Sequence, residues 1–485
     1  MPSESNSSTE LLKYSSWIES HTFENCKLNR KSYGEFLFNY LIGEKDGFVL
    51  NIDSNWGSGK TEFLKRLYTI SHKANHPVIY IDSWESDFSK DPLSVIAFEL
   101  LAQIEKYMEP ESDSSLADRV TELKGKLSQF KQKIALFAGI GTAAAGLGDS
   151  VGAGITNVVL DEPATKNEKL VENLSKNYQS QISAIKDIKN QLSLITELLE
   201  VIYEMKSPLI ILVDELDRCR PTYAIEMLEV VKHFFNTEKV VFVIATDTKQ
   251  LCHAIKAVYG NTFESETYLR RFFDRTAQLP PPEFEAYLSY QDLDFSKYSD
   301  ISLHPTGSHD LSLKSIIAIL FKSYELEVRD LDQLLAQLHA CLRAINNIHQ
   351  GSIINLIVLF TAIIENNKNL PVFYSREDID CSHRANPPKI FNIEDGFSSS
   401  DIINQSLDSI KHITELHDDY GEQRRIITIQ RPHFLNRNLR ENAGSKQLNF
   451  IEKISTMLRS AEGRRDSLWK WSQYKQCVEL AGHIN

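Results

Sequence analysis

The chain contains 485 residues, of which 42% are hydrophobic and 25% are charged, and its formal net charge at pH 7 is −13. This length exceeds a single compact core, and the composition is that of a soluble globular protein. The acidic balance argues against broad, non-specific binding of nucleic acid, and six cysteines without paired spacing argue against a disulfide framework or a zinc site.

The N-terminal segment predicts neither a signal peptide nor folded structure. Residues 1–20 begin with a polar run that lacks both a basic segment and an apolar stretch, and we expect them to be disordered. An amphipathic helix is predicted over residues 27–42. The unpaired cysteines suit a reducing cytoplasm, and no apolar run reaches about 18 residues, so we predict a cytoplasmic protein without an ordinary transmembrane helix. Association with the inner face of a membrane stays open.

Residues 48–61 carry the most informative pattern in the chain. An apolar run leads into a glycine-rich turn and then into a helix that begins near Lys60-Thr61, which is the strand–turn–helix context of a phosphate-binding loop. The N–H groups of such a turn and the positive end of the helix converge on an anion. We expect Lys60 to reach the β- and γ-phosphates of a nucleoside triphosphate and Thr61 to hold Mg²⁺. The residues predicted to bind the nucleotide here are Asn55, Trp56, Gly57, Ser58, Gly59, Lys60 and Thr61.

One position departs from the usual phosphate-loop pattern. Ser54 stands where a glycine is usual, but this position closes the strand and is compatible with a negative φ. An ordinary flexible turn is the alternative interpretation of Gly-Ser-Gly-Lys-Thr taken alone. The rest of the sequence decides between the two.

A second strand is predicted over Pro77–Asp82 and a helix over Pro92–Tyr107, after which residues 108–206 form an unusual insertion. Apolar residues recur at intervals of three and four on both sides of it, which favours two helices packed against each other as a hairpin. The seams are Leu116, Val120, Leu123, Leu127, Phe130 and Ile134 on one side, and Ile182, Ile185, Ile188, Leu192, Ile195, Leu199 and Ile202 on the other.

The predicted tip of this hairpin, residues 134–160, is rich in glycine and alanine, and Asp149 is its one charged residue. Three interpretations stay open: contact with a membrane, self-packing through Ala135, Gly139 and Ala143, or a flexible loop. The apolar stretches are short and interrupted, so self-packing or a loop is favoured over membrane contact.

A second motif supports nucleotide binding. The apolar run at 209–213 predicts a strand buried on both faces of a parallel sheet, and it ends in Asp214-Glu215. Asp214 at the end of a strand can coordinate Mg²⁺ opposite Thr61, and Glu215 is placed to orient and deprotonate an attacking water. A charged strand end that opens a solvated loop is the weaker alternative.

The alternation of strands and helices predicts a doubly wound parallel α/β sheet, with ligand chemistry at the carboxyl ends of the strands. A helix is expected over Tyr223–Phe235, a strand over Val240–Ala245 and a last strand over Thr276–Leu279. Thr246-Asp247 would then lie at the same edge as the phosphate loop. Asp247 is a candidate sensor of the γ-phosphate or the cap of the next helix, and the sequence favours neither.

Together these residues resemble the KAP family of P-loop NTPases. The chain has the form Trp-Gly-x-Gly-Lys-[Ser/Thr] over Trp56–Thr61, an aromatic motif at Asp82-Ser83-Trp84, and Asp-Glu-Leu-Asp-Arg-Cys at 214–219, where the family usually has Asp-Asp-Leu-Asp-Arg-Cys. Phe242–Asp247, Tyr259-Gly260, Tyr268-Leu269 and Leu279-Pro280 follow in the expected order. The resemblance covers about residues 20–345, with the insertion inside it.

The resemblance implies a P-loop NTPase core over 21–282, a linker over 283–310 that we expect to be irregular, and a helical lid over 311–370. Helices are predicted at 311–321, 326–346 and 352–366, whereas residues 371–485 carry no chemical motif. In related ring-forming NTPases an arginine before the last strand reaches a neighbour's γ-phosphate, so Arg270, Arg271 and Arg275 are candidates, with a solvated basic surface as the equal alternative. Arg329 is the candidate lid arginine, and a surface salt bridge is the slightly favoured alternative.

We therefore predict a Mg²⁺-dependent ATPase that acts as a conformational or assembly switch. The resemblance also implies a homo-oligomer or protein partners, and a role in defence against phage for some bacterial members. Two rival functions stay open: an ATPase motor acting on nucleic acid, which the acidic chain does not favour, and a nucleotide-dependent scaffold with little turnover.

Overall fold

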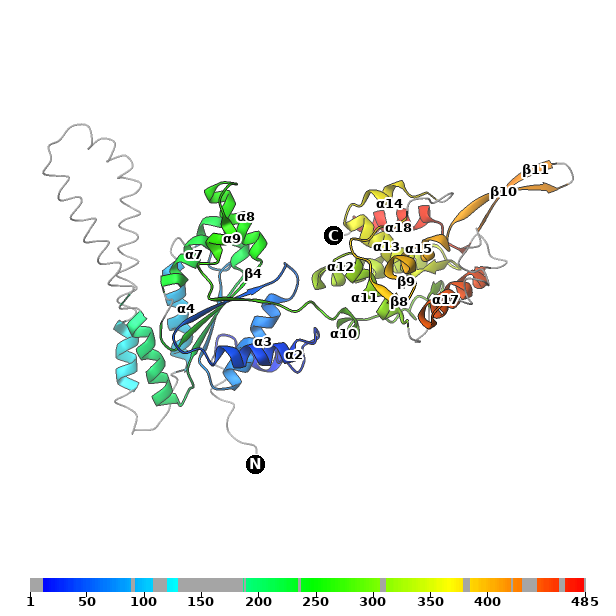
Figure 1. The fold of residues 1–485 in the computed structure, drawn as a ribbon. Coiled ribbons are helices and arrows are strands. Elements are labelled where there is room, and N and C mark those ends of the chain that lie inside the picture. The colour runs from blue at the N-terminus through cyan, green and yellow to red at the C-terminus, as the bar shows by residue number, and fades with distance from the viewer. Residues whose placement is uncertain are drawn as a thin grey trace, which may run out of the picture. The chain divides into compact units, whose positions relative to one another are not determined.

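The computed structural model describes residues 12–88, 92–107, 120–129, 186, 189–233, 237–305, 311–377, 384–419, 422–429, 443–461 and 467–483. The chain divides into two compact units, Met1–Pro281 and Pro282–Asn485. Figure 1 shows a sheet flanked by helices in the first unit and a mainly helical second unit.

The first unit is built on a five-stranded sheet in the order β2-β3-β4-β1-β5, in which every neighbouring pair is parallel. All six residues of β3 and all seven of β4 are buried, because helices cover both faces of the sheet. This confirms the predicted parallel α/β fold. The strands are β1 (Phe48–Asp53), β2 (Val78–Asp82), β3 (Leu209–Asp214), β4 (Val240–Thr246) and β5 (Arg275–Gln278).

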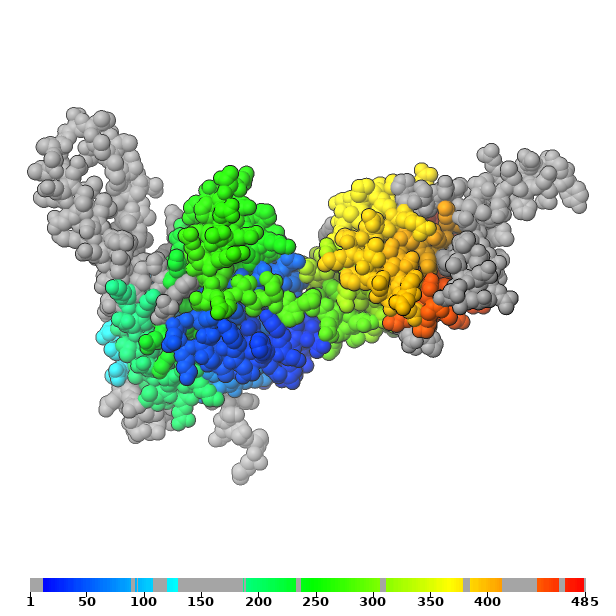
Figure 2. All heavy atoms as spheres, in the orientation of Figure 1, coloured from blue at the N-terminus to red at the C-terminus, as the bar shows by residue number. Residues whose placement is uncertain are grey.

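Alternate strand residues enter two separate hydrophobic clusters. Leu50, Leu212 and Val243 pack with α2 and α3 on one face, whereas Ile211 and Phe242 pack with α4, α7 and α8 on the other. In the space-filling view the blue N-terminal residues of this unit border its green later segments (Figure 2), in agreement with the pairing of β1 with β4 and β5. The helices are α1 (Ser15–Ser20), α2 (Lys31–Leu41), α3 (Lys60–Lys73), α4 (Pro92–Tyr107), α7 (Pro221–His233), α8 (Thr248–Tyr259), α9 (Ser265–Leu269) and the 3₁₀ helix η3 (Leu216–Arg218).

The N-terminal segment corrects one prediction. Residues 12–20, expected to be disordered, include α1, while residues 1–11 lie outside the described part of the chain. The Trp17 ring stacks on Tyr14 with centroids 4.2 Å apart and meets Tyr80 edge-on at 4.9 Å. These aromatic contacts offset the ordering entropy of a short polar segment.

The inserted segment is helical at residues 120–129, 186 and 189–203, whereas residues 204–206, which lead into β3, are not. Leu123 and Leu127 from the first part and Leu192, Ile195 and Leu199 from the second are buried in the cluster that also contains α4. The predicted seam residues Leu116, Phe130, Ile134, Ile182, Ile185 and Ile188 and the tip 134–160 lie outside the described residues. Within the part that the structure describes, no helix has the length and apolar character needed to cross a membrane.

The second unit packs its long helices around α13, ten of whose twelve residues are buried. The last helix, α18, contacts both α12 and α13, so the C-terminal residues share a unit with the predicted lid helices. The elements are α10 (Phe284–Leu288), β6 (Ser302–His304), α11 (Leu313–Ser323), α12 (Val328–Ile348), β7 (Ile353–Asn355), α13 (Leu356–Asn367), α14 (Pro371–Ser375), β8 (Asn392–Glu394), β9 (Phe397–Ser398), α15 (Ser399–Asp408), β10 (His412–Asp419), β11 (Glu422–Ile429), α17 (Ser445–Ala461) and α18 (Trp471–Gly482).

Two predictions for the second unit were wrong in detail. Residues 283–310 are not wholly irregular, because Phe284 and Leu288 are buried on α10, and β6 pairs in parallel with β7. The predicted helix at 352–366 begins only at Leu356. Asn355 ends β7 and caps α13, its Oδ1 accepting hydrogen bonds from the N–H groups of Ile357 at 3.0 Å and Val358 at 3.3 Å.

Candidate functional site

The predicted phosphate loop lies at the carboxyl edge of the sheet in the first unit. Strand β4 separates β1 from β3, and the register places Asp53 beside Thr246 and Asp82 beside Asp214. The loop after β1, the acidic pair after β3 and Asp247 after β4 therefore share one edge, as expected for the ligand site of a parallel sheet.

The loop backbone has the conformation that its glycines predict. Gly57 and Gly59 adopt φ values of 81° and 90°, and Gly59 directly precedes α3. A Cβ atom built on Gly59 would lie 3.1 Å from Leu28 Cδ1, so another residue would strain the positive φ and would also force the Leu28 side chain to shift. Ser54, in contrast, lies outside the left-handed region, and its N–H donates to the carbonyl of Thr246 at 3.1 Å. Serine therefore fits its position without backbone strain.

Lys60 projects back across the loop from the first turn of α3. Its Nζ donates to the Ser54 carbonyl at 2.7 Å and to the Asn55 carbonyl at 3.3 Å, and lies 3.6 Å from Asp217 Oδ2. The Lys60 side chain is 10% exposed and that of Asp217 is 2% exposed. The amine is thus held at the mouth of the loop by two carbonyls and one carboxylate.

The structure brings Thr61, Asp214 and Glu215 together. The Thr61 hydroxyl donates to Glu215 Oε1 at 3.2 Å and also interacts with Asp214. Asp214 is 1% exposed, and its carboxylate accepts hydrogen bonds from the Tyr80 hydroxyl at 2.8 Å and from the N–H of Glu215 at 2.9 Å. Two acceptor-rich carboxylates and a hydroxyl therefore face one another across the ends of β3 and α3.

Burial sets the electrostatics of the acidic pair. Removal from water raises the pKa of Asp214 above the usual aspartate range. Partial burial, and then the neighbouring charge of Asp214, raise the pKa of Glu215 as well, while its ion pair with Arg218 opposes that rise. A carboxylate with a raised pKa is a stronger base, which is the property needed to accept a proton from water.

The residues at this edge fit a magnesium ion and a phosphate chain. Mg²⁺ prefers hard oxygen ligands and is held by one or two carboxylates together with substrate phosphates, which matches Asp214 and the Thr61 hydroxyl. A divalent cation would also offset the cost of burying the Asp214 charge. Among the described residues, Ser58 Oγ and Asp217 Oδ1 are buried without a hydrogen-bond partner, so polar groups remain available beside the loop.

Asp247 acts as a helix cap in this structure. Its Oδ1 accepts a hydrogen bond from the N–H of Gln250 at 3.2 Å at the start of α8, which supports the capping interpretation. Its Oδ2 accepts from the N–H of Trp56 at 3.2 Å, so the same carboxylate also fixes the phosphate loop. A role as γ-phosphate sensor stays a prediction.

Asp217 is a residue of the site that was not among the predicted site residues. Its Oδ2 accepts a hydrogen bond from the Trp56 indole N–H in addition to its pairing with Lys60. The turn of η3 directs Asp217 back towards the loop, three residues after Asp214. The signal was present as the second aspartate of Asp-Glu-Leu-Asp-Arg, but only the folded turn shows what it contacts.

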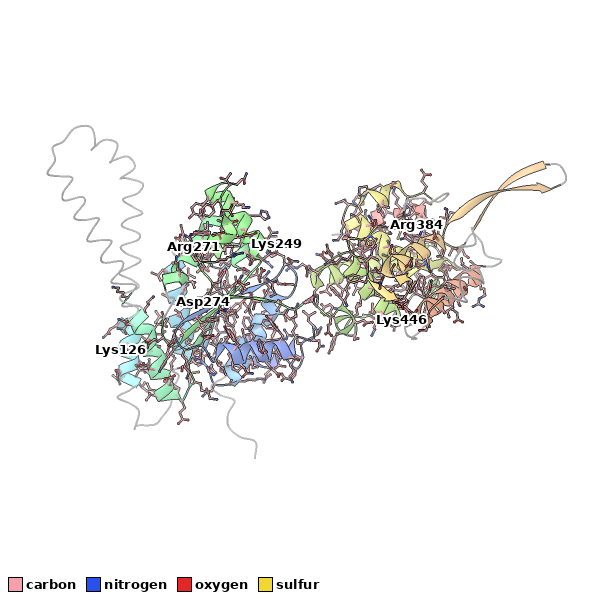
Figure 3. All side chains as sticks on the ribbon, viewed as in Figure 1. Lys126, Lys249, Arg271, Asp274, Arg384 and Lys446 are labelled. Atoms are coloured by element: carbon pink, nitrogen blue, oxygen red, sulfur yellow. The ribbon has the colours of Figure 1, made fainter. Side chains whose placement is uncertain are left out.

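The three candidate finger arginines do not join this site. Arg270, Arg271 and Arg275 are exposed, and Arg271 and Asp274 lie on the segment between α9 and β5 (Figure 3). Arg275 pairs in register with Leu50, three residues before Asp53 ends β1, so its backbone is about 10 Å from the loop end of the sheet. Action on a neighbouring molecule stays a prediction.

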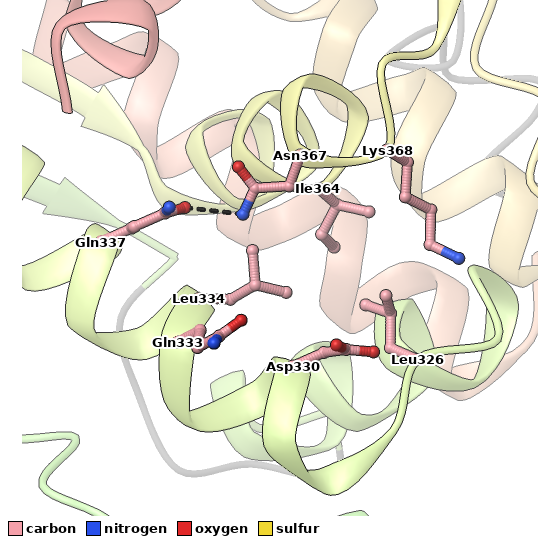
Figure 4. Close-up of a pocket in the computed structure, with 8 residues that line it drawn as sticks. All are labelled: Leu326, Asp330, Gln333, Leu334, Gln337, Ile364, Asn367 and Lys368. Carbon is pink, nitrogen blue, oxygen red and sulfur yellow. Dashed lines mark hydrogen bonds between the residues drawn. The ribbon is translucent and has the colours of Figure 1, made fainter. Parts of the chain in front are cut away.

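The second unit contains Arg329 in the first turn of α12 and a pocket between α12 and α13. Glu327 and Asp330 form a capping box at this turn, and Arg329 stays a predicted lid residue. The pocket has a volume of about 450 Å³, and a 2.8 Å hydrogen bond between Asn367 and Gln337 crosses its rim (Figure 4). None of the predicted site residues lines it; its lining residues are Leu326, Asp330, Gln333, Leu334, Gln337, Ile364, Asn367 and Lys368.

Comparisons with known proteins bear on the family of this chain. Curated proteins give no match to the chain. Solved structures similar to it include the Aeropyrum pernix ORC2 protein in ADPNP-ADP complexes, at 11% identity over 88% of this chain and 95% of that chain. The TM-score of that pair is 0.28, too low to support an argument. The model of the KAP family P-loop domain matches residues 30–345, which include the phosphate loop, the acidic pair and Asp247. The chain therefore belongs to the KAP family of P-loop NTPases.

Proposed function

We propose that this protein binds ATP with Mg²⁺ and hydrolyses it, and that the nucleotide state switches its conformation or its assembly. The observation that carries the proposal is the meeting of Lys60, Thr61, Asp214 and Glu215 at one edge of the sheet. Family membership supports nucleotide binding in general, and the arrangement of these four side chains supports hydrolysis.

Each residue has a distinct part in the proposed reaction. The loop amides and Lys60 bind and orient the phosphate chain, and the positive end of α3 favours the same negative charge. Thr61 and Asp214 would hold Mg²⁺, which supplies charge neutralisation for the β- and γ-phosphates. Glu215 orients a water molecule and accepts its proton as the water oxygen attacks the γ-phosphorus and the bond to the bridging oxygen of ADP breaks.

The backbone conformation and the neighbours of Glu215 orient its carboxylate for the proposed activation of water. Its backbone adopts the left-handed conformation with φ of 58°, an uncommon choice for a non-glycine residue that supports a functional constraint. Thr61 donates to one carboxylate oxygen and Arg218 pairs with the other. The side chain is thus oriented from two directions, beside the residues that would hold the metal.

The Glu215→Gln variant tests hydrolysis. Glutamine retains the size and the acceptor oxygen but cannot take a proton, so we expect ATP binding to persist while turnover falls about 100-fold or more. Glu85→Gln is a matched control, because Glu85 is an exposed carboxylate just after the neighbouring strand β2. Turnover that is unchanged in Glu215→Gln would favour the scaffold function and reject hydrolysis by this residue.

The setting of the activity is part of the proposal. We propose that the protein works with further copies of itself or with other proteins. In an assembly of copies, an exposed arginine among Arg270, Arg271 and Arg275 would reach the γ-phosphate bound by a neighbouring copy. We also propose that the protein belongs to a multi-protein system such as one for defence against phage. The family resemblance supports this setting. A nucleic-acid motor is the alternative, and an ATPase rate unaffected by added DNA or RNA would dispose of it.

A further inference from the structure

A buried arginine outside the recognised motifs holds the outer side of the phosphate loop. Arg30, which directly precedes α2, is 3% exposed. Its Nη1 donates to the carbonyl of Ser58 at 2.9 Å, while its Nε and Nη2 donate to the carbonyl of Pro280 at 3.1 Å and 2.6 Å. One guanidinium therefore joins two segments that are far apart in the sequence.

The contact with Ser58 fixes the orientation of a loop peptide. A peptide unit is planar and trans, so its C=O and N–H point in opposite directions. Because Arg30 holds the Ser58 carbonyl, the N–H of Gly59 is directed away from the guanidinium. The guanidinium also lies beside the next residue, since a Cβ on Gly59 would be in van der Waals contact with Arg30 Nη1 at 3.4 Å. A loop N–H is thereby kept in one orientation before any ligand binds.

The contact with Pro280 lies where the chain leaves the first unit. Strand β5 ends at Gln278, the N–H of Leu279 still donates to the carbonyl of Asp53 at 3.1 Å, and the first unit ends at Pro281. Tyr33, from the first turn of α2, also donates to this segment, through the carbonyl of Gln278 at 2.9 Å. Arg30 and Tyr33, at the start of α2, therefore both bond to residues 278–281, which are called the exit segment below.

We propose that Arg30 is a positioning residue that orients the Ser58–Gly59 peptide for phosphate and couples occupancy of the loop to the exit segment 278–281. The inference rests on the proposed function, because it assumes that the loop binds a nucleotide. If the Ser58 carbonyl shifts when phosphate occupies the loop, its hydrogen bond to the guanidinium changes. Because the same guanidinium donates to the Pro280 carbonyl, the change is passed on to that segment. Lysine cannot replace this geometry, because a single amine does not present the planar set of donors that spans both carbonyls.

The test compares Arg30→Ala and Arg30→Lys with Arg66→Ala. Arg66 is a matched control: it is 8% exposed in the same unit, but it bonds to Glu62 on its own helix, at 2.8 Å, and contacts neither carbonyl. ATP affinity with Mg²⁺ is measured by calorimetry on the full chain. Hydrogen–deuterium exchange is measured over residues 275–288 and over 209–218, each with and without saturating ATP.

In the wild type we expect ATP to alter exchange in both regions. In Arg30→Ala the ATP dissociation constant should rise about tenfold or more, and saturating ATP should still protect 209–218 but no longer alter 275–288. Arg30→Lys should show the same loss of coupling with a smaller loss of affinity, which keeps the test informative should the alanine variant fail to fold. Arg66→Ala should stay within about threefold of the wild type and retain both responses.

The outcomes separate the inference from the function beneath it. If the Arg30 variants match Arg66→Ala in affinity, or if ATP still alters exchange over 275–288 in them, the role of Arg30 is wrong while nucleotide binding stands. If the wild type itself binds no nucleotide, both the proposed function and this inference are overturned.

Discussion

Replacing Asp214 with asparagine should stabilise the first unit while abolishing the metal-dependent part of nucleotide binding. Asp214 is 1% exposed and carries its charge between Tyr80 and the N–H of Glu215. Asparagine has nearly the same shape. Its carbonyl can accept from the Glu215 N–H and from the Thr61 hydroxyl, and its amide can donate to the Tyr80 oxygen. All three contacts survive the substitution without a buried charge.

The size of the effect follows from these contacts. Burial of an ion costs several kcal/mol, here taken as about 4 kcal/mol. The Tyr80 hydroxyl, the Glu215 N–H and the Thr61 hydroxyl all bond to Asp214, and three hydrogen bonds to a charged group return about 2 kcal/mol each, whereas three neutral ones return about 1 kcal/mol each. Asparagine therefore loses about 3 kcal/mol of hydrogen bonding and removes about 4 kcal/mol of desolvation cost. The free energy of unfolding of the first unit should rise by about 1 kcal/mol.

The effect should depend on pH in one direction. Because burial raises the folded-state pKa of Asp214 above its unfolded value, ionisation opposes folding at neutral pH. This opposition fades as the pH falls through the folded-state pKa towards the ordinary aspartate range. Asparagine does not titrate, so its advantage over the wild type should be largest at neutral pH and should shrink on acidification.

The assay is urea unfolding without nucleotide or metal. Unfolding of the first unit is monitored by hydrogen–deuterium exchange of peptides that cover β1 and β3. Asp82→Asn is the control, because Asp82 lies beside Asp214 in the register and its Oδ1 accepts two backbone hydrogen bonds at 3.0 Å. It should lose at most about 2 kcal/mol and keep Mg²⁺-dependent binding. An Asp214→Asn variant that is less stable than the wild type at pH 7, or whose advantage grows in acid, would refute this reasoning.

The remaining predictions concern the loop glycine and the core of the second unit. Gly59→Ala forces a Cβ to within 3.1 Å of Leu28 at a φ of 90°, so we expect nucleotide binding at least tenfold weaker by calorimetry. Gly125 lies on a helix, and a Cβ at this position would meet nothing within 4 Å. Gly125→Ala should therefore raise the free energy of unfolding by up to about 1 kcal/mol, measured by urea unfolding. Arg376→Met leaves the buried charge of Glu365 without its ion-pair partner, since both side chains are 0% exposed and paired at 2.7 Å. The free energy of unfolding of the second unit should fall by about 3–5 kcal/mol, measured by hydrogen exchange in α13. Replacing Glu365 with leucine in the same chain should recover most of that loss, and a double variant as unstable as the single one would contradict the assignment.

Local sequence patterns were sufficient to predict the sheet and the positions of the phosphate loop and the acidic pair along it. The continuous apolar runs of β3 and β4 and the glycines of the loop act within a few residues of one another, and the structure has them in the predicted order. The helix predicted from Ser352 was wrong at its start, because Ile353–Asn355 form β7, and a short apolar stretch fits a strand or a helix equally well. Asn355 resolves it, since its side chain caps α13 and ends the strand.

Contacts between distant segments could not be predicted in this way. Arg30 meets Pro280 across 250 residues, and Trp56 meets Asp217 across 161. Trp17 is held by Tyr80, while its own neighbours in sequence are polar enough to suggest disorder. In each case the two residues meet only because the folded chain brings distant segments together. The composition and spacing around either residue therefore cannot predict its partner.

Calorimetric titration of ATP with saturating Mg²⁺ into the wild type and into Lys60→Ala tests the central claim most directly. The claim is that Lys60 and Thr61 on one side, and Asp214 and Glu215 on the other, enclose the phosphates and their metal. We predict saturable binding close to one nucleotide per chain in the wild type and its loss in Lys60→Ala. Heat absent for every common triphosphate, or equal affinity in the two proteins, would contradict it.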